Sequence, residues 1–585
     1  MSEAATLSTG DARRVGAIRI AIGFVQGLAL WGLTEAEKHH AWPSTEVGLF
    51  GALFMAVALT PFVLLGGLTT LQRRSLAVWG LFAAAVLAGI GLYDAVRRAE
   101  PASGFGYSGG ILLFVAAGLF VAHHLVEGGD AERRLIARYP RYFDVAWKHG
   151  VQIVLSAAFV GVFWGVLLLG AGLFDLIGVR FVSELIGKSW FVLPATATMF
   201  AAAVHLTDVR SGLIRGVRTV VLTLLAWLLP VLALLAAAFL AALPFTGLDP
   251  LWKTRSAAAF LLGAAAVMIV LINAAYQDGE PDGIVPLPLR LAGRLGGLLL
   301  APLVGLAAYA LWLRIAQHGL TPDRVVGAAL ALVGGVYAVG YAWAAIRLGR
   351  WMRRVEVTNI AAAFVGLAVL LAVLSPLADP AKLSVNDQMA RLKTGRVTAE
   401  RFDYDFLRHG GEVYGRRALQ TLKAGGGEAG RRAVEALERK PQWERPQLSV
   451  RDVTGRIEVW PAGAQLPESF RAARISQMRG VLPGCLTGPG RCDAAVLDLD
   501  GDARPEVLLW ADGGLYAFAV SRSGEWELAG RYGESCAERL LTQQDFQQGR
   551  LRAVEPLWKD LQAGDLRLSM TPNPGICSGS FAPQP

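Results

Sequence analysis

The sequence predicts a membrane all-α protein, a polytopic helical bundle of about 11 transmembrane helices, followed by a small α+β extracytoplasmic domain with an antiparallel β-meander. Of its 585 residues, 54% are hydrophobic and only 18% are charged, a balance that ordinary soluble domains do not show. Apolar runs long enough to cross about 30 Å of hydrocarbon recur through the first two thirds of the chain. All four cysteines lie after residue 484, which sets the C-terminal part apart as a separate domain.

The net charge of +9 comes from the membrane part of the chain. Residues 1–377 hold 28 Lys and Arg against 20 Asp and Glu, whereas residues 378–585 hold 28 against 27. Basic residues in short loops between apolar runs are typical of proteins that insert into membranes. The charge therefore indicates the lipid bilayer as a partner, and we expect no nucleic-acid partner.

The predicted domain order begins with a cytoplasmic N-terminus, residues 1–14, and a transmembrane helical domain, residues 15–377. No small-residue cleavage site follows the first apolar run, so we expect it to be a span and not a removed signal peptide. Ten further runs have the length of a transmembrane helix. The eleven predicted spans are residues 15–33, 47–66, 76–94, 109–126, 151–173, 189–206, 218–242, 257–276, 289–313, 324–346 and 358–377.

The orientation follows from the Lys and Arg residues in alternate connections between the spans. The set of connections that includes the N-terminus holds 17 basic residues, and the other set holds nine. The richer set is expected in the cytoplasm. An odd number of spans then places the C-terminal domain outside the cytoplasm, and an even number would reverse that placement.

Almost no ionisable residue falls inside the predicted spans. Arg19 lies about one turn inside the first span, where its side chain is expected to snorkel to the cytoplasmic face. His123, His124 and His205 lie at span ends and are interpreted as interfacial side chains. Because ion-coupled transporters usually need buried carboxylates, this pattern disfavours that class of protein.

The clearest deep polar groups are the amide side chains of Gln26, Gln152 and Asn273. In a lipid-handling protein, Gln26 and Asn273 would orient the headgroup of the substrate. Gly161 and Gly165 form a small-xxx-small pair, a pattern that favours close packing of two helices.

A juxtamembrane helical segment, residues 378–445, is predicted after the last span. Residues 379–424 combine charges with apolar side chains at helical spacing, which predicts an amphipathic helix. The glycine run 425–427 ends this helix, and residues 428–440 predict a second one.

The last predicted domain, residues 446–585, is β-rich and contains all four cysteines. Residues 450–460 alternate in polarity as a strand does. Three later runs are separated by turns that contain glycine, which predicts the antiparallel meander. These runs are residues 506–510, 515–520 and 526–532.

An even number of cysteines confined to one domain fits an oxidising compartment. Cys485 and Cys492 bracket a turn-rich stretch that could close a short disulfide loop, which would leave Cys536 to pair with Cys577. Four cysteines allow three pairings, and the sequence leaves all three open. A zinc site is disfavoured because no two cysteines have a gap of two to four residues.

The motif Asp498-Leu-Asp500-Gly-Asp502-Ala-Arg-Pro-Glu506 runs directly into a predicted strand. Its carboxylates are spaced to surround a hard cation with oxygen atoms, so calcium is the one cofactor that the sequence suggests. The motif resembles the calcium loops of integrin-type propeller repeats, although Ala503 stands where Gly is usual. The alternative interpretation is an ordinary Asx-type turn between two strands.

No sequence motif assigns a catalytic residue. Nucleophile elbows, phosphate-cradling loops, the Rossmann glycine fingerprint and zinc-protease helices are all missing from the sequence in the required context. Asp403 and Asp405 form the least implausible acid pair, but residues two apart on a helix point in different directions. The sequence therefore favours a protein that is not an enzyme.

Several motifs between residues 15 and 420 resemble a family of bacterial inner-membrane proteins, catalogued as domain of unknown function 4153. The resemblance implies a bacterial envelope protein, and it implies no chemistry. Together with the orientation that the basic residues predict, it gives a bacterial inner-membrane protein with a cytoplasmic N-terminus and a periplasmic C-terminal domain. The motifs are Arg19–Gly27, Phe163–Gly165, Leu173–Gly178, Trp190–Pro194, His205–Asp208, Leu377–Pro380, Ser384, Gln388, Arg391-Leu392, Gly395-Arg396, Phe402–Arg408 and Tyr414-Gly415.

Three functions are compatible with the sequence. The first is a membrane protein that displays a periplasmic domain for interaction or sensing, with an envelope protein as partner. The second is a transporter or lipid-handling protein with a lipid ligand. The third is a membrane-embedded enzyme that acts on a lipid-linked substrate. The oligomeric state is left open.

Overall fold

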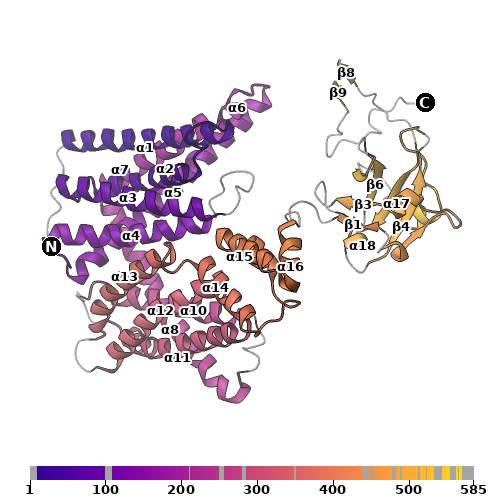
Figure 1. Cartoon of the computed structure of the whole chain (residues 1–585). Helices are drawn as coiled ribbons and strands as arrows, with labels where there is room; N and C mark the ends of the chain where they lie inside the picture. The colour runs from indigo at the N-terminus through magenta and orange to yellow at the C-terminus, as the bar shows by residue number, and fades with distance from the viewer. Residues whose placement is uncertain are drawn as a thin grey trace. The chain divides into compact units, whose positions relative to one another are not determined.

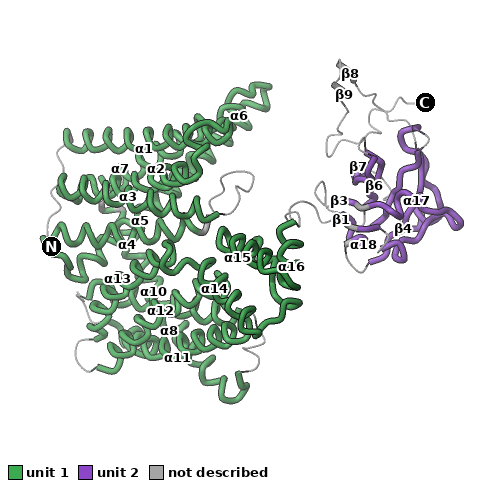
Figure 2. The backbone as a smooth tube through the Cα atoms, viewed as in Figure 1, with its two compact units in different colours: residues 1–438 green, residues 439–585 purple. Residues whose placement is uncertain are grey.

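A computed structural model shows a chain of two compact units, residues 1–438 and residues 439–585 (Figure 2). The described residues are 9–98, 109–209, 211–248, 254, 256–279, 285–347, 351–438, 447–450, 453–476, 482–487, 490–502, 504–511, 514–521, 524–532, 543–553, 561–563 and 566–568.

Among the described residues of the first unit, eleven helices are long and apolar enough to cross a membrane, which confirms the predicted polytopic bundle. These helices, with α6 (Phe181–Ile186) as a short connection, fill the bundle in Figure 1. They are α1 (Thr9–Lys38), α2 (Val47–Gly67), α3 (Arg73–Arg97), α4 (Gly109–Glu132), α5 (Tyr139–Leu176), α7 (Ser189–Val209), α8 (Ser211–Thr246), α10 (Ala257–Tyr276), α11 (Leu287–His318), α12 (Pro322–Ile346) and α13 (Arg354–Val373).

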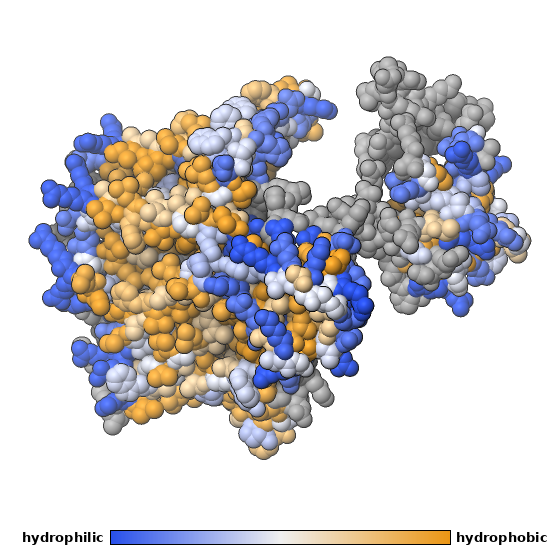
Figure 3. Space-filling view, viewed as in Figure 1, coloured by the Kyte–Doolittle hydropathy of each residue, from blue (hydrophilic) through white to orange (hydrophobic). Residues whose placement is uncertain are grey.

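The surface of this bundle is apolar over a broad belt, with hydrophilic residues beyond it on both sides (Figure 3). Large side chains such as Leu81 and Val339 are about three-quarters exposed there. Exposed apolar side chains at that density are expected where lipid and not water is the solvent.

The bundle consists of two groups of helices. The N-terminal group pairs α1 with α7 and α2 with α3, and the C-terminal group packs α8, α10, α11, α12 and α13 around one large hydrophobic core. Helices α4 and α5 contact both groups.

Glycine allows a close contact between two helices of the N-terminal group. A Cβ atom at Gly23 would lie 2.5 Å from the Ala197 carbonyl oxygen, and one at Gly27 would lie 2.3 Å from Pro194 Cα. Helices α1 and α7 therefore meet through a small-xxx-small pair. At Gly161 and Gly165, the pair that the sequence suggested, a Cβ atom would have no neighbour within 4 Å among the described residues, so this pair does not bring two described helices of the chain together.

The segment after the last span forms three helices around a small core of its own. They are α14 (Pro380–Lys393), α15 (Glu412–Gly425) and α16 (Gly427–Glu438), with a π-helical turn, η1 (Phe406–Gly410), before α15. The predicted single helix over residues 379–424 is thus two helices, because residues 394–405 turn the chain between them.

Helix α14 is held to the N-terminal group by what we call the α14 clamp: Tyr93, Asp94, Arg97, Asp379 and Tyr414. Asp379 is fully buried, and its carboxylate accepts hydrogen bonds from Lys382 N at 3.0 Å and from Tyr93 Oη at 2.8 Å. Arg97 lies 2.9 Å from Asp94 and 3.5 Å from Asp379. One carboxylate therefore caps α14 and ties it to the end of α3.

Helix α14 also binds the end of α11 in the C-terminal group. Asp387 accepts a hydrogen bond from Leu320 N at 2.7 Å, and Arg391 Nη2 donates to the Gln317 carbonyl at 2.8 Å. Gly319, with φ of 77°, makes this helix end turn. Arg391 thus binds a carbonyl group that the C-terminal end of a helix leaves without a partner, and Asp387 binds the backbone just beyond it.

The second unit contains a five-stranded mixed sheet in the order β2-β4-β5-β6-β7. Strands β4 to β7 pair antiparallel in sequence order, which confirms the predicted meander, and β2 adds to β4 in parallel. The strands are β1 (Gln447–Ser449), β2 (Ile457–Val459), β3 (Arg474–Ser476), β4 (Cys492–Leu497), β5 (Glu506–Ala511), β6 (Gly514–Val520), β7 (Trp526–Tyr532), β8 (Leu561–Ala563) and β9 (Leu566–Leu568).

Short helices complete this unit. They are η3 (Thr454–Arg456), α17 (Glu468–Arg471), α18 (Gly484–Thr487) and α19 (Gln543–Gln547). The single strand predicted over residues 450–460 is wrong, because the turn of η3 separates β1 from β2. Strand β4 was missed because its first residue, Cys492, was interpreted only as the end of a disulfide loop.

We expect Asp379→Ala to lower the free energy of unfolding by about 2–4 kcal/mol, because it removes a helix cap and leaves Arg97 short of an acidic partner. Thermal unfolding of the detergent-solubilised chain measures this loss. Asp323→Ala, at an exposed position in the first turn of α12, is the control and should cost less than about 1 kcal/mol. Equal melting of the two variants would contradict the role of the clamp.

Candidate functional site

A cavity of about 240 Å³ lies between α2, α4, α5 and α7. Most of its wall is aliphatic or aromatic, and the remaining lining consists of three imidazoles and one amide. The lining residues are Leu59, Phe62, Val63, Leu65, Gly66, Ala116, Leu119, Phe120, His123, His124, His149, Gln152, Ile153, Phe200 and Val204.

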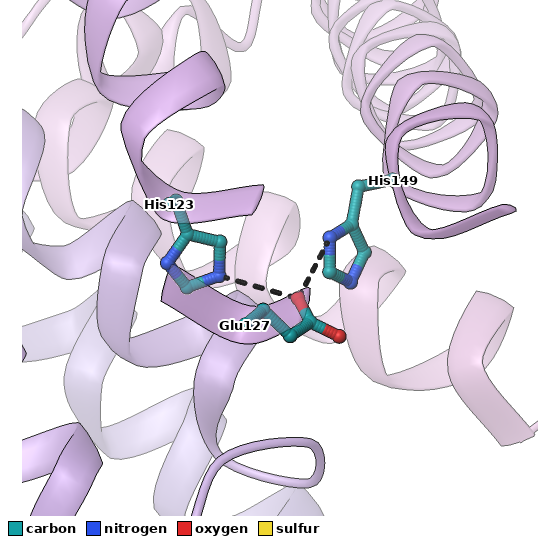
Figure 4. Close-up of side chains that lie close together, drawn as sticks. All are labelled: His123, Glu127 and His149. Atoms are coloured by element: carbon teal, nitrogen blue, oxygen red, sulfur yellow. Dashed lines mark ion pairs between the residues drawn. The ribbon is translucent and has the colours of Figure 1, made fainter. Parts of the chain in front are cut away.

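The polar end of the cavity is built by the last turns of α4 and the first turns of α5. His123 and Glu127 are one turn apart on α4, so both side chains lie on one face of that helix. His149 of α5 approaches the same carboxylate (Figure 4). His123 Nε2 lies 3.7 Å from Glu127 Oε2, and His149 Nδ1 lies 3.6 Å from it.

Hydrogen bonds orient the rings at this end. Trp79 Nε1 donates to His123 Nδ1 at 3.0 Å, and His124 Nδ1 contacts the carbonyl oxygen of Phe120. His124 Nε2 lies 3.0 Å from His149 Nδ1. The three imidazoles are therefore fixed by neighbours on three different helices.

A buried ion pair lies beside this cluster. Arg19 is 1% exposed, and it donates to Asp208 at 3.0 Å and to the Leu65 carbonyl at 3.2 Å. Lys148, next to His149 in the chain, lies 2.9 Å from the same aspartate. Arg19 therefore does not snorkel to the surface as expected; its charge is neutralised inside the bundle.

The expectation that the spans hold almost no ionisable residue was wrong. Asp94 and Glu127 are also buried in the bundle, at 1% and 2% exposure. His123 and His124 are also buried, at 6% and 5% exposure, so their rings face the interior of the bundle and not lipid headgroups. The error came from the span limits: the apolar runs stop at residue 126 and start again at 151, whereas α4 continues to Glu132 and α5 begins at Tyr139.

One signal in the sequence could have found this site. The stretch His123-His-Leu-Val-Glu127 places an imidazole and a carboxylate at positions i and i+4, a spacing at which helical side chains meet. His149, which comes from another helix, could not be assigned without the tertiary structure.

The three deep amides have internal partners. Gln26 donates to the Ala58 carbonyl at 2.9 Å, and Asn273 donates to Tyr341 Oη at 2.8 Å within a network that includes Asn359. Gln152 donates to the Val204 carbonyl at 2.9 Å, and it alone of the three lines the cavity. Gln26 and Asn273 are therefore structural side chains and not headgroup ligands in this cavity.

In the second unit, the structure brings three of the four predicted calcium ligands together. Asp498, Asp500 and Glu506 offer oxygen atoms that lie within 4.8 Å of one another. Asp502 is not in this group; its carboxylate accepts a hydrogen bond from Arg504 N at 2.7 Å. Glu506 also accepts from Leu499 N at 2.7 Å, so part of the loop is closed by its own backbone.

The described cysteines confirm one disulfide, between Cys485 and Cys492. Cys536 and Cys577, which the sequence left to pair with each other, lie outside the described residues. Asp403 and Asp405 are both exposed, and Asp403 caps the turn that follows by accepting from Phe406 N at 2.8 Å. This local contact gives Asp403 a structural role.

Calcium binding by the acidic loop stays a prediction. At millimolar calcium and a Kd of about 0.1 mM, binding should stabilise the second unit of the full chain by about 1–2 kcal/mol. Asp500→Ala should abolish this gain, and Glu525→Ala, at an exposed acid outside the loop, should retain it. Calorimetry of the wild-type chain with no heat at millimolar calcium would refute the prediction.

Comparison with known proteins gives one match. No curated protein and no solved structure matches the chain. The family model described as "Domain of unknown function (DUF4153)" matches residues 20–420, which is more than half of the 585 residues. The match includes all residues of the cavity and of the α14 clamp. The chain therefore belongs to this family.

Proposed function

We propose that this chain is a bacterial inner-membrane protein that binds an apolar, lipid-like molecule in the cavity between α2, α4, α5 and α7. The observation that carries the proposal is the composition of the cavity, whose walls are apolar and whose one end holds three imidazoles and an amide. A few convergent polar groups in an otherwise apolar pocket are typical of a ligand site.

The size of the cavity favours a single hydrocarbon chain over a whole phospholipid. Its volume of about 240 Å³ is below the range of about 300–1,000 Å³ that drug-sized ligands occupy. The imidazoles would then contact a polar group at the end of that chain, because ring nitrogens can donate or accept a hydrogen bond.

A ligand of this kind has a route from the bilayer. Phe62 and Ile153 line the cavity, and they are also 40% and 42% exposed on the apolar outer surface. Side chains that belong to both surfaces support entry from the lipid side, without passage through water. The desolvation cost of an apolar ligand would then stay small.

The C-terminal unit belongs to the same proposal as a displayed periplasmic domain for interaction or sensing. Two observations support its placement outside the cytoplasm. The connections on the same side of the membrane as the N-terminus hold 17 basic residues against nine on the other side, and Cys485 and Cys492 form a disulfide. Disulfides persist in oxidising compartments such as the periplasm.

Filling the cavity should remove the ligand. We expect Ala116→Trp, which places an indole among the lining residues, to reduce cross-linking of a photoactivatable fatty acid by at least about tenfold. Ala117→Trp is the matched control, because Ala117 is the next residue of α4 and is exposed on the outer surface. Mass spectrometry of the cross-linked peptides measures both. Cross-linking that is equal in the two variants would count against the cavity.

The orientation has its own test in a chain whose four cysteines are replaced by serine. A single cysteine introduced as Glu525→Cys should react with a membrane-impermeant maleimide in intact spheroplasts. The control Arg134→Cys, in the connection between α4 and α5, should react only after permeabilisation. The reverse pattern would invert the topology.

A further inference from the structure

Three ligand-type atoms converge at the polar end of the cavity, from two helices. They are His123 Nε2, Glu127 Oε2 and His149 Nδ1, and all lie within 4.8 Å of one another. Their residues are 6%, 2% and 6% exposed. Figure 4 shows both rings directed toward the carboxylate from opposite sides.

The distances in this cluster are too long for hydrogen bonds. His123 Nε2 and Glu127 Oε2 are buried and have no hydrogen-bond partner among the described residues. A buried carboxylate oxygen without a partner is costly. A cation between the three atoms would provide the missing interactions.

The same distances suit a metal ion. Two ligand atoms that each lie about 2.0–2.1 Å from a tetrahedral zinc are about 3.3–3.4 Å apart. The separations of 3.7 Å and 3.6 Å from Glu127 Oε2 exceed that value by only a few tenths of an ångström. A small rotation of the side chains would therefore close the site around an ion.

The geometry points to a binding site for a divalent transition metal of the zinc class, held by His123, Glu127 and His149. Two imidazoles and one carboxylate suit such an ion, whereas calcium and magnesium prefer oxygen ligands and copper(I) prefers sulfur. Both histidines line the cavity, so the fourth position would open toward it. Three protein ligands with an open position are typical of zinc sites that bind a further molecule.

Two hydrogen bonds to the proposed ligands would change on metal binding. His124 Nδ1 contacts the Phe120 carbonyl, which leaves its Nε2 lone pair facing His149 Nδ1 at 3.0 Å. A metal on His149 Nδ1 would displace the proton that lies between this atom and His124 Nε2. The Trp79 hydrogen bond to His123 Nδ1 would be given up, since a metal on Nε2 requires the proton on Nδ1.

The inference goes beyond the proposed function and does not rest on it, because it uses the ligand atoms and not the apolar wall. A chain that binds zinc but no fatty acid, or a fatty acid but no zinc, would separate the two.

The test uses the full-length chain in mild detergent, with its affinity tag removed, stripped with a chelator and reloaded with zinc chloride. Mass spectrometry of the metal content should give about one zinc per chain. Glu127→Gln and His149→Ala should each weaken zinc binding by at least about 100-fold in competition with a chromophoric chelator. Glu127→Gln keeps the size of the side chain, so it carries the test if His149→Ala fails to fold.

Three variants serve as controls. Glu132→Gln makes the same change elsewhere on α4, and His205→Ala removes another histidine of the bundle. Asp500→Ala removes a carboxylate of the acidic loop in the second unit. All three should keep one zinc per chain. Cobalt(II) in place of zinc should give visible absorption that Glu127→Gln changes. A wild-type chain that retains no zinc, or a Glu127→Gln variant that binds it as tightly, would overturn the inference.

Discussion

A charged side chain that leaves water for the interior of a bilayer needs hydrogen bonds and a partner of opposite charge in place of its hydration. This constraint organises the membrane unit. At one end of the unit, Asp208 forms ion pairs with Arg19 and Lys148. At the other end, Arg97 forms ion pairs with Asp94 and Asp379. Each group joins helices that are far apart in sequence. The apolar helix surfaces between the two charged groups contribute contact area between helices. The charged groups determine which helices are neighbours.

The sequence predicted what depends on local pattern. Eleven apolar runs, the antiparallel meander and the family were all predicted correctly, because hydropathy and turn residues act over short distances. Contacts between distant helices could not be predicted in that way. Arg19 was expected at the lipid surface, since nothing nearby in sequence shows that Asp208 lies 3.0 Å away. The buried cluster at His123 and Glu127 was missed because hydropathy alone set the span limits too short.

The candidate site combines two features that occur together for a physical reason. An apolar cavity excludes water, and a polar group at its rim then interacts more strongly than it would in water. His149 and Gln152 begin the apolar part of α5, so the change from polar to apolar lining occurs within one turn of that helix. A molecule with one polar end and one apolar end would match this change.

The clamp around α14 has a mechanical consequence. Helix α14 is bound to the end of α3 in one group of helices and to the end of α11 in the other. Because α14 contacts both groups, it keeps the distance between them constant at the end of the bundle where it binds. Any rotation of one group relative to the other must therefore leave that end in place. The distance between the two groups then changes most at the opposite end of the bundle, where the cavity and its histidines lie.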